Sequence, residues 1–480
     1  MTEQRGERLS LREKVSYGVG DLAAGLAVAS TAFWFLYYMT EVAGVSAAMA
    51  GTALMIGRLW DAVTDPVMGW VCDHTRSRWG KRRPYLLFGA LPFALSFIAL
   101  WVVPEFAAEE ARFWYVVIAL VVFNTALTVV FIPYTSLTAA MTADYHERTS
   151  LTAFRMSASL AASLIGGALP PLLVAWIISA EGQSFMHGLG AQEIFGTWAG
   201  TRRQGYLLFA GLFGVIMVAA LITTFLGTRE RYVATDREPG LREEGPLRYV
   251  MQLVALTGSS PAYRLSLLIK LFSTCAVTLI GVQLAYYIQF VLEMAADKPT
   301  IMGTLFCAAI ISTPLWVRFT KRRGKITAYR WAAGGYIVVL SSLLILGTGP
   351  TEVIYAVAVL AGICHAGVLI IPWTIIPDVV EFDEFESGRR REGLLYGGTT
   401  FAYKFASGLA LFIAGWVLSL VGYVPDSTQT PEAVTGILMS VVAGPVVLLA
   451  LSLVFTRAFP ITPERHAEVV AALSARKRSS

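Results

Sequence analysis

Two aspartates lie four residues apart inside an otherwise apolar segment. Asp61 and Asp65 occur in Gly57–Pro66, and on a helix this spacing places both carboxylates on one face, one turn apart. A charge at bilayer depth costs roughly 3 kcal/mol or more, so two charges of the same sign require a compensating cation or proton. The carboxylate oxygens and the hydroxyl of Thr64 are suitable ligands for a hard cation such as Na⁺, and neighbouring carboxylates can equally hold a proton. We therefore expect this segment to bind a coupling ion, Na⁺ or H⁺.

An internal ion pair is the structural alternative for these two acids. Arg58 precedes Asp61 by about one turn and is placed to neutralise a carboxylate. One arginine does not compensate two carboxylates, which favours the cation site. Pro66 removes a backbone donor and frees a carbonyl, as is found where a helix lines a cavity.

The composition places the whole chain in the membrane class. Of the 480 residues 56% are hydrophobic and 15% are charged, against roughly 25% charged in soluble domains. Apolar segments near the ~20 residues needed to cross a bilayer recur along the chain. They predict twelve transmembrane helices, at 14–42, 45–72, 84–104, 111–143, 151–180, 204–227, 263–293, 298–320, 327–348, 352–380, 392–422 and 431–458.

The distribution of basic residues predicts the orientation of these helices. With both termini inside, four of the 38 Lys and Arg residues lie outside, five lie in or at the edges of helices, and the other 29 are cytoplasmic. The opposite orientation violates the positive-inside rule in almost every loop. The net charge of +5 therefore reflects membrane topology, and we expect no nucleic-acid partner. We predict a protein integral to the plasma membrane (the inner membrane of a bacterium) with both termini cytoplasmic.

A polar stretch divides the chain into two halves of six helices each. The predicted parts are an N-terminal bundle (1–227), a central cytoplasmic loop (228–262), a C-terminal bundle (263–458) and a cytoplasmic tail (459–480). We expect the tail to form a short amphipathic helix at the membrane surface. The segment 181–203 is expected to be an external surface loop.

The two halves repeat short motifs at corresponding positions. The fourth helix of the first half contains Ile132-Pro133-Tyr134-Thr135, and the fourth helix of the second half contains Ile371-Pro372-Trp373-Thr374. Basic runs follow the second helix in both halves. Weak repeats of this kind mark transporters built from pseudo-symmetric bundles, with the substrate near the membrane midplane.

Charged residues within other helices are candidates for substrate binding or coupling. Lys404 lies deep in the eleventh helix, where it can be released when a cation binds or can hold a polar substrate. Arg155 lies near enough to the cytoplasmic end of its helix to snorkel, so a gate or a structural ion pair is its alternative role. Asp21 is expected either to cap or gate the cytoplasmic end or to bind a ligand. The predicted substrate and coupling residues are Lys404, Arg155, Arg58, Asp21, Tyr134 and Trp373.

Each half also has acidic and then basic residues at the cytoplasmic end of a helix. Asp73 is followed by Arg82 and Arg83, and Asp378 is followed by Arg390. Such clusters can hold one conformation of an alternating-access carrier, and we predict that these five residues gate transport. A solvated loop is the alternative for the second cluster.

The sequence contains no signature of catalysis. A Gly-rich nucleotide loop, zinc-ligand spacing and a Ser/His/Asp arrangement are all missing from it. We therefore expect no enzymatic activity, no cofactor other than the coupling ion, and no metal beyond a Na⁺ at Asp61 and Asp65. A membrane sensor or scaffold that binds a ligand without transporting it is the alternative from another functional class.

These motifs resemble the major facilitator superfamily and, more narrowly, the glycoside–pentoside–hexuronide:cation symporters of the melibiose-permease type. The resemblance runs nearly end to end, and its most specific part is the Asp61–Asp65 segment with the basic loop that follows. It implies an all-α fold of twelve transmembrane helices in two six-helix bundles. It also implies that Thr128 joins Asp61 and Asp65 in the cation site, that Lys404 is linked to the cation and sugar sites, and that Arg155 is conformationally important.

Three departures from that resemblance involve four positions. Gly25 stands where the melibiose-permease type has a sugar-binding acid, and Phe131 and Thr135 replace an acid and a tryptophan. Thr64 replaces an asparagine between the two cation-site acids, which leaves Na⁺ and H⁺ open. The first two departures make the cavity less polar, and the same wider group contains sodium-dependent lysophospholipid carriers.

The sequence thus predicts a carrier that works by alternating access. We expect it to symport a small sugar or glycoside with Na⁺ or H⁺ and to function as a monomer in the lipid bilayer. The alternative substrate is a lysophospholipid or another amphiphile, moved together with sodium.

Overall fold

Long apolar segments in this chain form helices because a helix satisfies its own backbone hydrogen bonds within a membrane. The computed structural model describes residues 9–142, 144–188, 196–198, 200–231, 256–346, 349–389, 391–425 and 427–479. All regular structure in these ranges is helical, and eleven of the helices there are long and apolar enough to cross a membrane. A further helix of 28 residues, α2 (Ala47–His74), includes Arg58, Asp61 and Asp65, which lower its hydropathy. The predicted all-α membrane fold is confirmed.

The chain divides into two compact units. Unit 1 comprises Met1–Glu238 with the short pieces Ala296–Thr300 and Val424–Thr428, and unit 2 comprises the remaining residues. Most of the predicted central loop, residues 232–255, lies outside the described residues.

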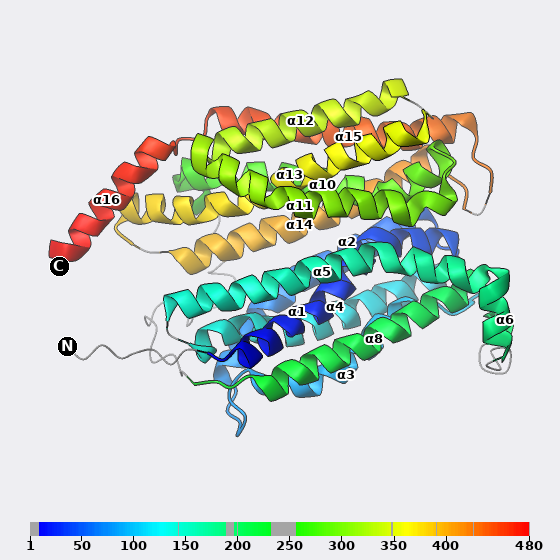
Figure 1. Ribbon diagram of the computed structural model, residues 1–480, viewed down its shortest axis with the longest axis horizontal. Coiled ribbons are helices and arrows are strands. Elements are labelled where there is room, and N and C mark those ends of the chain that lie inside the picture. Colours follow the sequence, from blue (N-terminus) through cyan, green and yellow to red (C-terminus); the bar gives the residue numbers. More distant parts are fainter. Residues whose placement is uncertain are drawn as a thin grey trace. The chain divides into compact units, whose positions relative to one another are not determined.

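Unit 1 contains six long helices. They are α1 (Leu11–Glu41), α2, α3 (Arg83–Leu100), α4 (Glu109–Met141), α5 (Tyr145–Ile178) and α8 (Arg202–Gly227). Helix α1 lies against α5 and α8, and α4 lies against α2 and α3 (Figure 1). Aromatic rings fill the core at one end, where Trp101 stacks on Tyr206 with centroids 5.5 Å apart. The close contact of α2 with α4 positions the predicted cation ligands.

Unit 2 contains the helices of the second half. They are α10 (Pro261–Tyr286), the π-helical turn η2 (Tyr287–Val291), α11 (Lys298–Arg323), α12 (Lys325–Leu346), α13 (Thr351–Ser387), α14 (Glu392–Leu420), α15 (Pro431–Arg457) and α16 (Pro463–Ser479). Helix α10 packs against α13, α14 and α15. Helix α12 lies against α13 and α15 (Figure 1). Helix α13 extends well beyond the predicted end at 380 and stops where Gly388 adopts a φ of 67°, a conformation that favours glycine.

The external segment predicted as a loop begins with a helix. Helix α6 (Ala180–Gly188) follows α5, and a 3₁₀ turn, η1 (Gly196–Trp198), lies further along. The Ser179 hydroxyl accepts a hydrogen bond from the Gly182 N–H, so a local N-cap starts α6. Periodicity over so short a segment did not reveal it.

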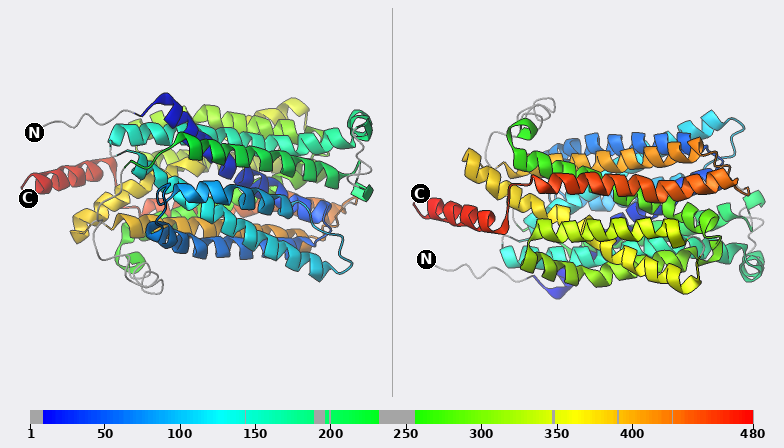
Figure 2. Two further views of the ribbon diagram at one scale, coloured as in Figure 1. Left: turned by 90° about the horizontal axis from the view of Figure 1, so that it is seen from below. Right: turned by 90° about the horizontal axis from the view of Figure 1, so that it is seen from above.

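The C-terminal helix does form, but its apolar side packs on protein. Val469 and Leu473 of α16 are buried in a cluster with Ile376 of α13, and His466 Nε2 lies 2.7 Å from Glu381 Oε2. Helix α13 extends far enough to contact α16, which projects beyond the end of α15 (Figure 2). The expected position at the membrane surface stays a prediction.

Candidate functional site

Four side-chain oxygens of α2 and α4 converge inside unit 1. Thr128 Oγ1 lies 3.1 Å from Asp61 Oδ1, 3.0 Å from Asp65 Oδ1 and 3.3 Å from the Thr64 hydroxyl. Asp61 and Thr128 are 3% and 2% exposed, and Asp65 is partly exposed. All four predicted cation ligands thus form one cluster, which we call the α2–α4 cluster.

The Thr128 hydroxyl has one proton for two carboxylates. It can donate to Asp61 or to Asp65 but not fully to both, so one of its two contacts leaves acceptor oxygens facing each other. Close acceptor oxygens are stabilised by a proton on one carboxylate or by a cation between them. The α2–α4 cluster is therefore suited to reversible capture of H⁺ or Na⁺.

Helix α2 has an exposed apolar side that is distinct from the side bearing its acids. Val63, Val67 and Trp70 are 60%, 58% and 57% exposed, whereas the carboxylates point toward α4. Helix α2 stays continuous through Pro66. The acids therefore face the protein interior, and the apolar side chains occupy the outward surface.

Two residues that sequence reasoning missed, Gly57 and Asn124, lie where α2 contacts α4. A Cβ on Gly57 would lie 3.1 Å from both Leu120 Cβ and Asn124 Nδ2, so glycine permits the close approach. Asn124 is 4% exposed and donates to the Leu120 carbonyl at 2.8 Å. It lies one turn before Thr128, and an amide at that spacing in an apolar helix is the signal that could have identified it.

Arg58 does not compensate these acids within the described part of the chain. Its guanidinium has no ion pair or hydrogen bond with a described residue, although it precedes Asp61 by less than one turn. An ion pair of Arg58 with Asp61 or Asp65 is therefore not observed among the described residues.

A second polar cluster joins α1, α4 and α5. Asp21 is 3% exposed, and the Arg155 guanidinium is near enough to interact electrostatically with its carboxylate. The Tyr134 hydroxyl donates to the Tyr17 carbonyl at 2.8 Å, and the two rings stack with centroids 5.0 Å apart. Three predicted substrate and coupling residues are thus neighbours, and Tyr134 contacts the backbone of α1.

In unit 2, Trp373 contacts a lysine that sequence reasoning counted within a helix but gave no role. Lys270 Nζ lies 4.2 Å from the ring centroid of Trp373 and 5.2 Å from that of Tyr403. Lys404 follows Tyr403 on α14 and is partly exposed. A lysine far from both ends of an apolar helix was the available signal for Lys270.

The predicted gate residues after α2 make contacts inside unit 1. The Glu230 carboxylate accepts hydrogen bonds from the backbone N–H groups of Lys81, Arg82 and Arg83 at 2.9, 2.7 and 3.1 Å. The Arg83 guanidinium donates to the Phe225 carbonyl at 2.6 Å. A carboxylate at this helix start stabilises α3, because it satisfies free N–H groups and faces the positive end of the helix dipole.

Two other predicted gate residues, Asp73 and Arg390, lie partly or wholly outside the described residues. The side chain of Asp73 and all of Arg390 lie outside the described residues. Asp378 accepts a hydrogen bond from Lys325 Nζ at 2.6 Å, and His466 Nε2 lies 3.5 Å from the same oxygen. The acid of the second cluster therefore contacts α12 and α16.

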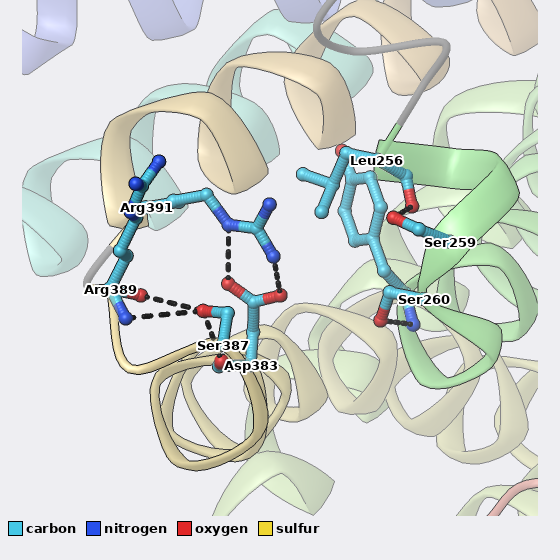
Figure 3. A network of polar contacts seen from close by, with 8 residues as sticks. Leu256, Ser259, Ser260, Asp383, Ser387, Arg389 and Arg391 are labelled. Carbon is cyan, nitrogen blue, oxygen red and sulfur yellow. Dashed lines mark hydrogen bonds and ion pairs between the residues drawn. The ribbon is translucent and has the colours of Figure 1, made fainter.

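A different acid–base pair joins α13 to α14. Asp383 accepts from Arg391 Nε at 3.0 Å and from its terminal nitrogen at 2.5 Å, which makes a bidentate pair (Figure 3). The Asp383 side chain is 3% exposed. Between the two helices, the Ser387 hydroxyl contacts the Arg389 carbonyl and accepts a hydrogen bond from the Arg389 N–H. The Ser387 side chain therefore holds the turn after α13.

The donor set of the α2–α4 cluster bears on the type of ion it could hold. No group of three or more His, Cys, Asp or Glu side chains suited to a metal ion occurs among the described residues. Two carboxylates and two hydroxyls are hard oxygen donors, which fit an alkali cation better than a transition metal.

Comparison with known proteins gives the chain a clear set of relatives. A family model described as MFS/sugar transport protein matches residues 16–463. A protein named for glycoside/cation symport, YagG of Escherichia coli (strain K12), is 30% identical over 95% of this chain and 94% of its own length. The sodium-dependent lysophosphatidylcholine symporter 1 of Gallus gallus is 28% identical over 96% of this chain and 89% of its own. The symporter sll1374 of Synechocystis sp. (strain ATCC 27184 / PCC 6803 / Kazusa) is 28% identical over 99% and 98%.

Solved structures share the fold at low sequence identity. A bacterial homologue of the human lysosomal transporter Spinster has a TM-score of 0.65 at 12% identity, over 94% of this chain and 98% of that one. A D-xylose–proton symporter has a TM-score of 0.61 at 13% identity, also over 94% and 98%. At these identities the likeness shows a common architecture.

Proposed function

Because this chain belongs to the MFS/sugar transport protein family, we propose that it moves a sugar or glycoside across the membrane together with Na⁺ or H⁺, by alternating access, and catalyses no reaction. The words glycoside/cation symporter in the name of its relative YagG support the substrate class. The monovalent cation is a co-substrate, and no other cofactor is needed.

One observation carries this proposal: Thr128 Oγ1 contacts the carboxylates of both Asp61 and Asp65. A cation bound there adds a positive charge beside the two carboxylates, accepts the Thr128 hydroxyl oxygen as a ligand and draws α2 and α4 together. If the bound state favours the conformation that binds solute, cation binding raises solute affinity. Solute binding must then raise cation affinity by the same factor.

The other predicted residues take supporting roles in this scheme. Lys404, Trp373, Arg155, Asp21, Tyr134 and Arg58 bind the solute or couple it to the cation. Arg82, Arg83 and Asp378, together with Asp73 and Arg390, gate the cytoplasmic side. The carrier acts as a monomer in the plasma membrane, the inner membrane of a bacterium, and both its termini are cytoplasmic.

Replacing either acid by its amide tests the proposed coupling. In Asp61→Asn and Asp65→Asn, loss of a charged ligand worth about 1.5–3 kcal/mol weakens cation binding roughly 10- to 150-fold. We expect cation-driven solute accumulation in proteoliposomes to disappear. Exchange of solute down its own gradient should persist at saturating solute, because the fold is retained.

The matched control for these variants is Glu432→Gln, an exposed acid in the first turn of α15. It should accumulate solute like the unaltered protein. Full cation-driven accumulation by correctly inserted Asp61→Asn and Asp65→Asn would show that the coupling site lies elsewhere.

A lysophospholipid is the second candidate substrate. The similarity to a sodium-dependent lysophosphatidylcholine symporter, which spans 96% of this chain, favours it. Competition between a labelled glycoside and lysophosphatidylcholine for uptake into proteoliposomes separates the two. If only the lysolipid is taken up, the proposed substrate becomes a lysophospholipid, and the proposed cation site is unaffected.

A further inference from the structure

Lys270 is a buried basic residue for which cation coupling at α2 and α4 provides no role. It is the tenth residue of α10, about 14 Å along the helix at 1.5 Å per residue, and it is 1% exposed. An ammonium group at such depth is unfavourable unless neighbouring groups compensate its charge.

Two aromatic rings provide part of that compensation. Nζ lies 4.2 Å from the Trp373 centroid and 5.2 Å from the Tyr403 centroid, distances at which the ring faces attract a cation. The two rings are 5.7 Å apart and inclined at 54°, so they form two walls around the ammonium group. Such contacts offset only part of the cost of burying the charge.

The surrounding helices provide no acid at this depth. Helix α10 contains no acidic residue, and α14 and α15 have acids only in their first turns. Nearest to Trp373 on α13 is Asp378, more than one turn away, and it bonds to Lys325. Among the described residues, the Lys270 ammonium group has no hydrogen bond or ion pair, and only the Lys270 carbonyl accepts a side-chain hydrogen bond, from Ser273.

The first half of the chain differs at the corresponding place. Asp21, the eleventh residue of α1, interacts with Arg155 on α5. In the second half the corresponding helices are α10 and α14, and the charged residues within them are both basic: Lys270, which is buried, and Lys404, which is partly exposed. Asp21 thus has an oppositely charged neighbour, Arg155, whereas Lys270 has no such neighbour among the described residues.

We propose that Lys270, Trp373 and Tyr403 form a subsite that binds an anionic group, a carboxylate or a phosphate, of the transported solute. Trp373 and Tyr403 are partly exposed, which leaves ring surface for the uncharged part of the solute to stack on. The inference rests on the proposed transport function and narrows its substrate class to organic anions.

Binding of probe pairs that differ in one charge tests the subsite. The purified full-length protein in Na⁺ is titrated with methyl β-glucuronide against methyl β-glucoside, and with lysophosphatidic acid against monoacylglycerol. We expect the acidic member of one pair to bind at least tenfold more tightly, and that pair identifies whether the anion belongs to a sugar or to a lipid. In Lys270→Met the preference should fall to about twofold or less, while affinity for the neutral member changes little.

Matched variants separate a charge effect from a folding effect. Lys270→Arg keeps the charge and should retain the preference, and Lys321→Met, an exposed lysine on α11, should leave it unchanged. Lys270→Gln replaces the Met variant if that protein aggregates. Equal binding of both members by the unaltered protein in both pairs would overturn the proposal, as would a preference that survives in Lys270→Met and Lys270→Gln.

The Na⁺ dependence of binding keeps this test distinct from that of the coupling site. A charge preference that depends on Lys270, together with unchanged Na⁺ dependence in Asp61→Asn and Asp65→Asn, would reject the coupling site and keep the subsite. Loss of the Na⁺ dependence in Asp61→Asn and Asp65→Asn, together with a charge preference that does not depend on Lys270, would reject the subsite alone.

Discussion

At the scale of single residues, the central feature is one hydroxyl shared by two carboxylates. Asp61 and Asp65 were identifiable because their spacing and their apolar surroundings are local properties. The contact with Thr128 was expected only from the family resemblance, since 63 residues separate it from Asp65. Lys270 received no role because its aromatic neighbours lie on two distant helices.

Thr128 variants test the shared hydroxyl. In Thr128→Val the methyl group replaces a donor to charged acceptors, a loss of about 1.5–3 kcal/mol. We expect cation affinity, measured by isothermal titration, to fall at least tenfold, whereas Thr128→Ser should stay within about threefold of the unaltered protein. Equal cation affinity in the Val and Ser variants would contradict a ligand role for this hydroxyl.

At the scale of elements, charged side chains determine where helices begin and how they are joined. The basic residues after α2 suggested a gate from their charge alone, but the backbone N–H groups of Lys81, Arg82 and Arg83 bond to Glu230. That acid lies about 150 residues away in the chain, so no local pattern indicated it. Asp383 and Arg391 similarly join α13 to α14.

Removing the acid at the start of α3 tests this structural role. Glu230→Ala leaves three N–H groups without their acceptor and should destabilise the protein by about 1–2 kcal/mol. The expected result is a lower midpoint in thermal unfolding followed by intrinsic fluorescence. Glu230→Gln keeps an acceptor oxygen and should show a smaller decrease. Unchanged midpoints for both variants would mean that the contact contributes no stability.

At the scale of the whole molecule, the distribution of charge predicts which side of the membrane each loop occupies. Basic residues concentrate in the loops assigned to the cytoplasm, and short loops rich in Lys and Arg stay there during insertion. The prediction concerns the orientation of the chain, which the helices themselves do not determine.

Accessibility of single cysteines tests the orientation. With the four native cysteines replaced by serine, Ser427→Cys between α14 and α15 should react with a membrane-impermeant maleimide in intact cells. Arg322→Cys at the end of α11 should react only after permeabilisation, because we place it in the cytoplasm. Labelling in the opposite order would reverse the predicted topology.

The sequence by itself determined the membrane class, the helical fold and the two acids of α2, because hydropathy and helical spacing are properties of neighbouring residues. Helix ends were less well predicted: α13 runs to Ser387 and α16 packs on it, since both depend on contacts that form only after folding. No local pattern in the sequence placed Thr128 beside the two aspartates, which only the family resemblance had indicated, and the tertiary structure alone decided that Trp373 and Tyr403 flank Lys270. These contacts join residues tens to more than a hundred positions apart, and only the packing of helices brings such residues together.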